Sequence, residues 1–418
     1  MTLLSRFKKM VGGQKKGRLV EDWKFDSKSP ISAGPKICDF EGKGKKNLIF
    51  GTDDGKVYCV GSKGEKKWIF NVQEAVDKVE AMFYDQETAN SIQAEPNIYD
   101  LNGDGKKEIV VGSEMGVVYA ITPEGKNLWK FKADGSVRGS VFIHDLDGNG
   151  RPEIVFGCGD ENLYILNAQG ELVEKHEIGC SIKSTPNALK ENIVFGCDNG
   201  HVHCITLTGK ELWKYHTDDK IIAQPAVGNL YGDKKNYVVI GSFDQHLHCV
   251  DENGEEIWKY RTGGAIYSRA ILRDINKDKK LEVIFGSCDN NIYAVDSNGD
   301  KLWSYEADFW IVAPLIVEDI DGDGELEVVA GSYDHNLYVL DARGNYALDY
   351  VPGLSGVVQQ PGSYADVMTS EPGDLTGKKL WQYQADGVIV GCAYSHDNDN
   401  IIINTKKGII NVLKHEKR

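Results

Sequence analysis

Short apolar runs alternate along the chain with turns rich in Gly, Asn and Asp, and this pattern repeats. Four of the six steps between the glycines that end these β-branched runs are 45 residues long, and the other two are 61 and 39. Self-similarity at such a period is typical of a repeat architecture. The glycines are Gly51, Gly112, Gly157, Gly196, Gly241, Gly286 and Gly331.

Each glycine is followed by a turn, an apolar strand, a second glycine turn and a tryptophan. The tryptophan lies seventeen positions beyond the glycine at Trp68, Trp129, Trp213, Trp258 and Trp303. The third repeat has Glu174 at this position. Four short alternating strands per unit indicate a twisted antiparallel sheet, and sheets of this kind repeated around an axis form a β-propeller.

The two ends of the chain are incomplete units that complement each other. Trp23 precedes Gly51 by the 28 residues that separate a repeat tryptophan from the next glycine, but no full unit precedes it. The C-terminal segment 388–414 has three strands and lacks the fourth. We therefore predict an all-β, eight-bladed β-propeller with four antiparallel strands per blade, closed by the N-terminal strand, which completes the last blade and removes open sheet edges.

The predicted propeller spans residues 18–413, between a flexible segment at 1–17 and a tail at 414–418. Two insertions interrupt the period. The first, near 72–92, contains EAVDKVEAMFY, which has helical spacing. The second, near 344–376, is rich in Gly, Pro and Ser and is predicted to be a loop of blade seven.

The net charge restricts the kinds of partner that we expect, and the cysteine content indicates the cellular compartment. Sixty-three acidic against 48 basic residues leave a net charge of −15, which disfavours nucleic acid and anionic lipid as partners. No apolar run is long enough for a transmembrane helix, and no export signal is visible. Nine cysteines, most of them in apolar runs, are expected to be unpaired and buried, so we expect a cytoplasmic location and leave secretion by another route open.

One turn of the repeat carries a recognisable signature. Ala294, Asp296, Gly299 and Trp303 resemble the docking motif of pyrroloquinoline-quinone-type propeller repeats, one residue shorter. The resemblance implies that the tryptophans hold neighbouring blades together, and it makes a quinone-dependent dehydrogenase an alternative function, with Trp310 as the cofactor platform and Arg269 near the quinone. The adjacent cysteine pair of that family is absent, which argues against pyrroloquinoline quinone as a cofactor.

Four acidic loops, DLNGDGKKE, DLDGNGRPE, DINKDKKLE and DIDGDGELE, precede strands of the repeat. Oxygen side chains at positions 1, 3, 5 and 9 of a kinked loop suit the six to eight oxygen ligands of calcium. The loops look like those of FG-GAP repeats in integrin-type propellers. That family usually has Asp at position 9, where these loops have Glu, and the third loop lacks both glycines and adds lysines. The alternative is that they are simply polar turns. The resemblance implies these ligands: Asp100, Asn102, Asp104 and Glu108; Asp145, Asp147, Asn149 and Glu153; Asp274, Asn276, Asp278 and Glu282; Asp319, Asp321, Asp323 and Glu327.

A second candidate site lies on the opposite face, because first-to-second and third-to-fourth connections of an antiparallel blade share one face. The segments that lead into the innermost strands lie on the other face, near the axis, where propellers commonly bind ligands. Alternatively, these side chains form a solvated rim and pair with one another. The candidate residues are Gln93, Glu95, Arg138, Lys183, Gln224, Tyr267, Arg269 and Trp310.

The motifs of hydrolases, zinc proteases and phosphate-binding loops are absent from the sequence. We therefore predict a noncatalytic binding or interaction propeller stabilised by calcium, whose partner is another protein or a small polar ligand. A glycan- or peptide-binding propeller is a further alternative, suggested by Trp310 and the turn Ser332–Tyr333–Asp334.

Overall fold

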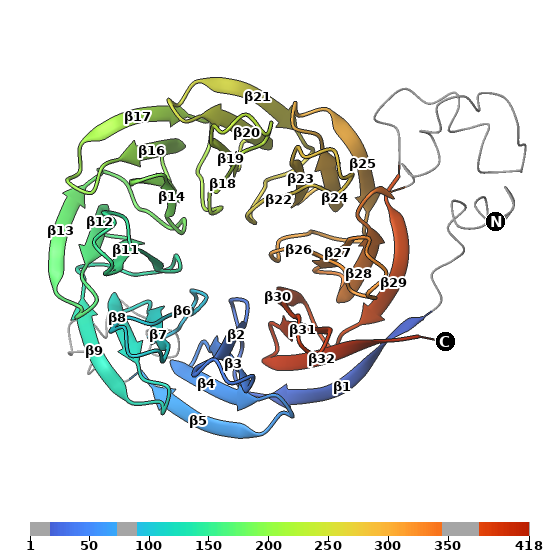
Figure 1. Ribbon diagram of the computed structural model, residues 1–418, viewed down its shortest axis with the longest axis horizontal. Helices are drawn as coiled ribbons and strands as arrows, with labels where there is room; N and C mark the ends of the chain where they lie inside the picture. The colour runs from blue at the N-terminus through green and yellow to red at the C-terminus, as the bar shows by residue number, and fades with distance from the viewer. Residues whose placement is uncertain (1–16, 73–89, 345–375, 418) are drawn as a thin grey trace, which may run out of the picture.

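Eight antiparallel sheets of four strands each stand around a common axis (Figure 1). The computed structural model describes residues 17–72, 90–344 and 376–417. Within these ranges the secondary structure consists of strands and turns without a helix. The predicted eight-bladed propeller is confirmed.

In blades one to four, consecutive strands run from the axis to the rim. Their bounds are β2 (Lys36–Asp39), β3 (Lys46–Gly51), β4 (Lys56–Gly61) and β5 (Lys66–Asn71); β6 (Asn97–Tyr99), β7 (Glu108–Gly112), β8 (Val117–Ile121) and β9 (Asn127–Lys132); β10 (Phe142–His144), β11 (Glu153–Gly157), β12 (Asn162–Leu166) and β13 (Leu172–Glu177); β14 (Asn187–Leu189), β15 (Asn192–Gly196), β16 (His201–Ile205) and β17 (Glu211–His216).

Blades five to seven repeat this order, and blade eight takes its outermost strand from the N-terminus. The bounds are β18 (Ala226–Gly228), β19 (Tyr237–Gly241), β20 (His246–Asp251) and β21 (Glu256–Arg261); β22 (Ile271–Arg273), β23 (Glu282–Gly286), β24 (Asn291–Val295) and β25 (Lys301–Glu306); β26 (Ile316–Glu318), β27 (Glu327–Gly331), β28 (Asn336–Asp341) and β29 (Lys378–Gln384); β30 (Ile389–Ser395), β31 (Asn400–Thr405), β32 (Ile409–Glu416) and β1 (Arg18–Asp26).

The burial of the strands explains their two kinds of sequence. Second strands such as β7 and β27 are buried at every position, because both faces of the sheet pack against neighbouring blades. The sequences of these second strands are therefore almost continuously apolar. Outermost strands such as β21 alternate between exposed and half-buried residues, since one face meets solvent. The apolar core is thus a series of layers between blades.

The glycine that ends each second strand is needed for the contact between blades. A side chain at Gly241 would collide with Ile266, which leads into the next blade. The other glycines of the series meet a β-branched residue in the same way, at Ile92, Val137, Ile182, Ile221, Ile311 and Ile389. The repeated glycine therefore reflects close packing between blades.

The repeat tryptophans also bridge blades. Trp258 donates its indole N–H to the carbonyl of Ser297 at 2.9 Å, and its ring lies against Gly299 of the next blade. Equivalent hydrogen bonds run from Trp23, Trp68, Trp129, Trp213 and Trp303. In blade three Glu174 takes the strand position of the tryptophan, but His176 makes the contact, with Nε2 3.0 Å from the carbonyl oxygen of Leu207.

The ring closes through the pairing of the two chain ends, blue β1 beside red β32 in Figure 1. Trp23 lies opposite Val412, as the sequence predicts. One predicted boundary was wrong: β32 continues to Glu416, because residues 414–416 pair with the start of β1 and do not form a tail. The helical pattern near 72–92 and the loop near 344–376 fall almost entirely outside the described residues, as does the segment 1–16.

The expectation that all nine cysteines are unpaired was wrong for two of them. Cys180 and Cys197 form a disulfide with a Cα–Cα distance of 6.3 Å. They are 17 residues apart in sequence, and the fold brings the segment before β14 against the turn after β15. The other seven cysteines, all within the described ranges, are free thiols. In those ranges no helix could cross a membrane.

Candidate functional site

A cavity of about 740 Å³ lies on the axis at the face where the chain leads into the innermost strands. We call this the channel face. All eight blades contribute to the lining. Seven of the eight residues predicted for this site are among the lining residues: Gln93, Glu95, Arg138, Lys183, Gln224, Tyr267 and Arg269.

The fold brings these residues together because each blade presents equivalent positions to the axis. The β-branched residue that packs on the glycine of the preceding blade points into the core, and the residues one and three positions later face the cavity. Alternate residues of an extended segment share a face, which explains this spacing. The first position is held by Ser32, Gln93, Arg138, Lys183, Ile222, Tyr267, Val312 and Val390, and the second by Gly34, Glu95, Ser140, Thr185, Gln224, Arg269, Pro314 and Cys392.

One further cation of the lining, Lys36, was not among the predicted residues. It continues the alternation Ser32, Gly34, Lys36 and pairs with Glu95, with Nζ 2.6 Å from Oε2. The period-two spacing is the signal that would have identified it.

The charged residues of the cavity come from blades one, two, three, four and six. Besides Lys36 the cavity has Arg138, whose Nε lies 2.8 Å from an oxygen of Glu114, and Lys183, whose Nζ lies 2.5 Å from Asp198. Arg138 and Lys183 are therefore paired with carboxylates that lie outside the eight residues predicted for the site.

Arg269 differs from the other three cations of the lining. Its hydrogen bond goes to the neutral amide oxygen of Gln224 at 3.2 Å. Among the described residues, four cations and a single carboxylate line the cavity, so the charge of this lining is opposite to that of the protein as a whole.

The remaining part of the cavity wall is apolar and comes from blades five, seven and eight. Ile222, Val312, Pro314, Val390 and Cys392 face the axis there. The cavity is therefore amphipathic, with apolar groups gathered at blades seven and eight and Ile222 between the cations of blades four and six.

Trp310 lies outside this lining. It precedes the core residue Ile311, and its backbone carbonyl accepts a hydrogen bond from the N–H of Tyr333, so it sits farther from the axis than the lining positions. Its side chain is 41% exposed and stacks on Phe309, with ring centroids 5.0 Å apart. The prediction that Trp310 joins the other seven residues was therefore wrong.

The acidic loops lie on the opposite face. In blade three the ligand atoms of Asp145, Asp147 and Glu153 lie within 4.8 Å of one another, and in blade seven those of Asp319, Asp321 and Glu327 do the same. Among the described residues, Oδ1 of Asp145 is buried and has no hydrogen-bond partner. A hard cation would fit these oxygens.

Part of the acidic sequence serves the turn itself. In all four loops the Glu at position 9 accepts the backbone N–H of position 2, at 2.8 to 2.9 Å. In blade six the second oxygen of Glu282 also accepts a hydrogen bond, from the amide of Asn276 at 3.0 Å. Burial raises the pKa of Glu282 to about 7, and Asp278 and Asp274 add to the rise. Both oxygens of Glu282 are thus engaged without an ion.

Burial also raises the pKa values of Glu108 and Glu153, and the neighbouring aspartates of each loop contribute to the rise. The carboxylates of a loop therefore repel one another when all are ionised. A bound divalent cation would relieve this repulsion. Whether calcium occupies any loop stays a prediction.

Comparison with known proteins identifies solved structures with the same fold. The crystal structure of BamB from Moraxella catarrhalis has a TM-score of 0.62 and 16% identity, over 95% of this chain and 97% of that chain. The crystal structure of BBS1N in complex with ARL6DN, soaked with mercury, has a TM-score of 0.54 and 12% identity, over 96% of this chain and 98% of that chain. At these identities the likeness shows the fold alone.

A comparison with curated protein sequences finds no significant match. The resemblance to quinone-type and FG-GAP repeats stays a prediction. One family matches more than half of the sequence: the lambda-carrageenase beta-propeller domain, over residues 75–185, 185–257 and 248–351. The chain therefore belongs to the family of the lambda-carrageenase beta-propeller domain.

Proposed function

We propose that this protein is a noncatalytic binding propeller and that an acidic segment of a partner protein binds in its central cavity. The observation that carries the proposal is the set of four cations, Lys36, Arg138, Lys183 and Arg269, in one cavity of a strongly acidic protein. The four cations outnumber Glu95, Glu114 and Asp198, the carboxylates that pair with them, and a concave site with an excess of one charge attracts ligands of the opposite sign.

The pairing of charges supports binding over catalysis. Glu95, Glu114 and Asp198, the carboxylates beside the cavity cations, are each held in an ion pair. These ion pairs hold the cations in place at the cavity. An ordered set of cations suits recognition of an anion.

The apolar wall supports a peptide as the ligand. Val312, Val390 and Ile222 can contact apolar side chains while the cations bind neighbouring carboxylates. The similar BBS1N structure is itself a complex with another protein, ARL6DN. An acidic peptide segment with apolar side chains would match both walls.

Charge reversal inside the cavity tests this proposal. We expect the double variant Lys183→Glu, Arg269→Glu to bind labelled acidic peptides at least about tenfold more weakly than the natural chain. Fluorescence anisotropy at two salt concentrations measures the affinity. The variant Lys259→Glu, on the exposed face of β21, changes one charge of the same kind outside the cavity and is the control. Equal binding by the double variant and the natural chain would refute the proposal.

A sulfated glycan is the second candidate ligand. The family name refers to an enzyme that acts on lambda-carrageenan, a sulfated polysaccharide. Phe309 and Trp310 expose 44% and 41% of their side chains on the channel face, and Trp310 also lies 6.2 Å from Tyr333. Exposed aromatic rings suit the apolar face of a sugar, and the cations of the cavity suit its anionic groups.

Lambda-carrageenan oligosaccharides and their desulfated forms separate the two candidates. If the glycan is the ligand, the natural chain binds the sulfated form, and Trp310→Ala weakens binding by about tenfold or more in isothermal titration. If the acidic peptide is the ligand, Trp310→Ala leaves peptide binding unchanged, since Trp310 lies outside the cavity lining.

We further propose that calcium binds the acidic loops of blades three and seven and stiffens them. The convergent oxygens of Asp145, Asp147 and Glu153, with the unpartnered Oδ1 of Asp145, support this assignment. Carboxylate oxygens are the ligands that calcium prefers. The loops of blades two and six are weaker candidates.

Chelation tests the calcium proposal. Calcium at 100 times its dissociation constant should stabilise the fold by about 2.7 kcal/mol per site, which a chelator removes. Thermal melts measure the shift. The double variant Asp145→Asn, Asp319→Asn should lose the response, while Asp274→Asn in blade six should keep it. A melting temperature that calcium does not change would contradict the proposal.

A further inference from the structure

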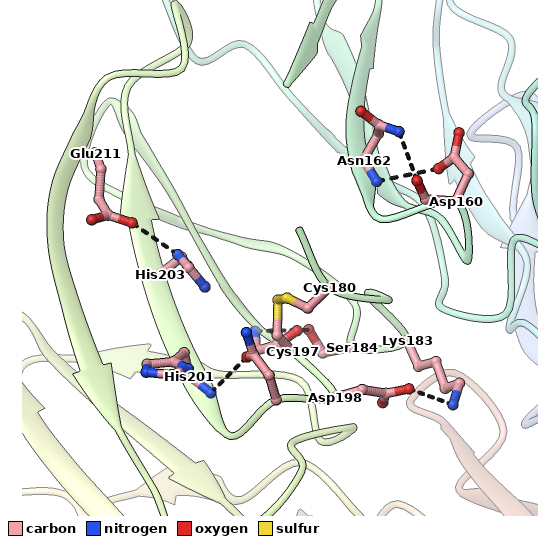
Figure 2. The surroundings of a disulfide bond; sticks show 12 residues. Asp160, Asn162, Cys180, Lys183, Ser184, Cys197, Asp198, His201, His203 and Glu211 are labelled. Atoms are coloured by element: carbon pink, nitrogen blue, oxygen red, sulfur yellow. Dashed lines mark hydrogen bonds and ion pairs between the residues drawn. A yellow bond between two sulfur atoms is a disulfide. The ribbon is translucent and has the colours of Figure 1, made fainter. Parts of the chain in front are cut away.

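The Cys180–Cys197 disulfide lies beside a histidine whose ring is buried in blade four (Figure 2). The two sulfur atoms and one ring nitrogen of His203 lie within 4.8 Å of one another. All three residues are buried, with exposed fractions of 6%, 0% and 3% for Cys180, Cys197 and His203. Two sulfurs and an imidazole nitrogen are ligands that zinc prefers.

The tautomer of His203 follows from its neighbour. Nδ1 lies 3.0 Å from Oε2 of Glu211, and a carboxylate can only accept a hydrogen bond, so Nδ1 carries the proton. Nε2 then presents a lone pair. Among the described residues this buried Nε2 has no hydrogen-bond partner. Figure 2 shows the ring between Glu211 on one side and the two cysteines on the other.

A carboxylate that orients a histidine is a common feature of metal sites. The ligating nitrogen faces the metal while the other N–H is held by a carboxylate or carbonyl. His203 has this arrangement toward Glu211 and the cysteines.

Blade five shows what the same place looks like without such a site. His248 is the equivalent histidine, and both of its ring nitrogens have partners: the hydroxyl of Tyr215 at Nδ1 and Asp244 at Nε2, each at 2.9 Å. The unpartnered nitrogen is therefore a feature of blade four and not of the repeat.

The disulfide is also specific to blade four. In blades five, six and seven a serine at the position of Cys197 donates to a backbone carbonyl at the position of Cys180, at 3.1 to 3.2 Å. A hydroxyl hydrogen bond is thus sufficient for this contact elsewhere in the ring. Contact between these two segments therefore does not explain why blade four has two cysteines beside a histidine nitrogen without a hydrogen-bond partner.

We propose that Cys180, Cys197 and His203 form a zinc site that opens when the disulfide is reduced. A dithiol reductant transfers two electrons and two protons, the S–S bond breaks, two thiols form and the reductant becomes a disulfide. Zn²⁺ then displaces the two thiol protons and binds two thiolates and Nε2 of His203. Ligand atoms around a tetrahedral zinc lie about 3.5 to 3.8 Å apart, so the two sulfurs must move apart by about 1.7 Å once the bond between them is broken.

The test uses the full chain, reduced with a phosphine, which becomes a phosphine oxide and does not compete for the metal. Cobalt(II) is the probe, because a thiolate-to-cobalt charge-transfer band reports sulfur ligands and is not produced by the acidic loops. We expect one equivalent to give this band in the reduced chain, and zinc to displace it. The oxidised chain should not give the band.

Variants assign the ligands. Cys197→Ser should abolish the band, while Cys158→Ser, at the equivalent position of blade three, should keep it. The exposed Glu211 positions His203, so Glu211→Gln should weaken zinc binding about 10- to 100-fold without loss of the fold. This variant keeps the test decisive if Cys197→Ser does not fold. A disulfide that resists reduction in the folded chain, a reduced chain without the band, or unchanged affinity in Glu211→Gln would overturn the proposal.

Discussion

At the scale of single residues, blade five contains a buried hydrogen-bonded network around one carboxylate. Asp244 accepts from Nε2 of His248 at 2.9 Å and from the backbone N–H groups of Asp218 and His246. Burial by itself would raise the pKa of Asp244, but the bond to His248 and the backbone donors outweigh it and lower the pKa to about 2. The ionised carboxylate therefore stabilises the fold.

This shift has a defined consequence for acid stability. The folded pKa of about 2 lies below the ordinary value of 3.8, so the contribution is complete above pH 3.8 and is lost as pH falls toward 2. We expect Asp244→Asn to lower the free energy of unfolding by about 2 kcal/mol at pH 7 and by much less at pH 2. Urea unfolding at both values measures the difference. The exposed Asp300 provides the control Asp300→Asn, and an equal loss at both pH values would contradict the argument.

A second residue-scale prediction concerns the glycine at the end of β19. Gly241→Ala places a methyl group against Ile266 and should destabilise the fold by about 1 to 3 kcal/mol. Combining it with Ile266→Ala makes room for that methyl group. The double variant should therefore lose about 0.5 to 3 kcal/mol less than the sum of the single losses in urea unfolding. Additive losses would show that the two residues do not share a contact.

At the scale of elements, six of the eight outermost strands are fastened to the next blade by a hydrogen bond from a tryptophan indole N–H. Trp258 in β21 reaches the turn between β24 and β25, where Asp296 accepts the N–H groups of Asn298 and Asp300 and so shapes the turn. The resemblance to quinone-type repeats rests on this turn. The residues of this turn are explained by its shape and by the docking of Trp258 from the preceding blade.

The indole hydrogen bond can be removed while an aromatic ring is kept at the same position. Trp258→Phe loses the bond to Ser297 and leaves that carbonyl without this donor, so we expect a loss of about 1 to 3 kcal/mol. Thermal unfolding measures it. Trp310→Phe is the matched control, since Trp310 is exposed and outside the repeat series. If both variants lose the same amount of stability, the hydrogen bond from Trp258 to Ser297 does not stabilise the fold more than an exposed tryptophan does.

At the scale of the whole molecule, closure depends on one strand. β1 covers the edge of β32 over its full length, and Trp23 reaches the backbone of Ser62 in blade one. Without β1, blade eight would present a long unpaired edge, which is a site for aggregation. The ion pair of Arg18 with Glu416 is exposed and adds little.

Deleting residues 1–26 tests closure. We expect a lower melting temperature and concentration-dependent association in size-exclusion chromatography. A synthetic peptide of residues 17–27 should restore the monomer by pairing with β32. Deleting residues 1–16 keeps β1 and is the control. A truncated chain that stays monomeric and equally stable would mean that the ring does not depend on this strand.

The repeat of 45 residues was sufficient to predict the fold, because each blade packs only on its neighbours and the pattern of glycines, turns and tryptophans records that packing locally. Seven of the eight residues predicted from this period line the cavity. The eighth, Trp310, lies outside the lining. The distance of a residue from the axis depends on where the chain crosses the rim, and the period does not encode that distance. Lys36 was missed although alternation along its strand points to it.

What the sequence determined by itself is therefore everything that recurs in register: the blade, the count of blades, the closing strand and the face of each loop. What the tertiary structure decided is what depends on distances between blades. The Cys180–Cys197 disulfide, the orphan nitrogen of His203 and the pairing of cavity cations with Glu95, Glu114 and Asp198 are contacts of this kind. The local spacing of residues specifies a strand and which of its side chains share a face. A contact between distant segments depends on how far apart the fold places them, and local spacing does not record that distance.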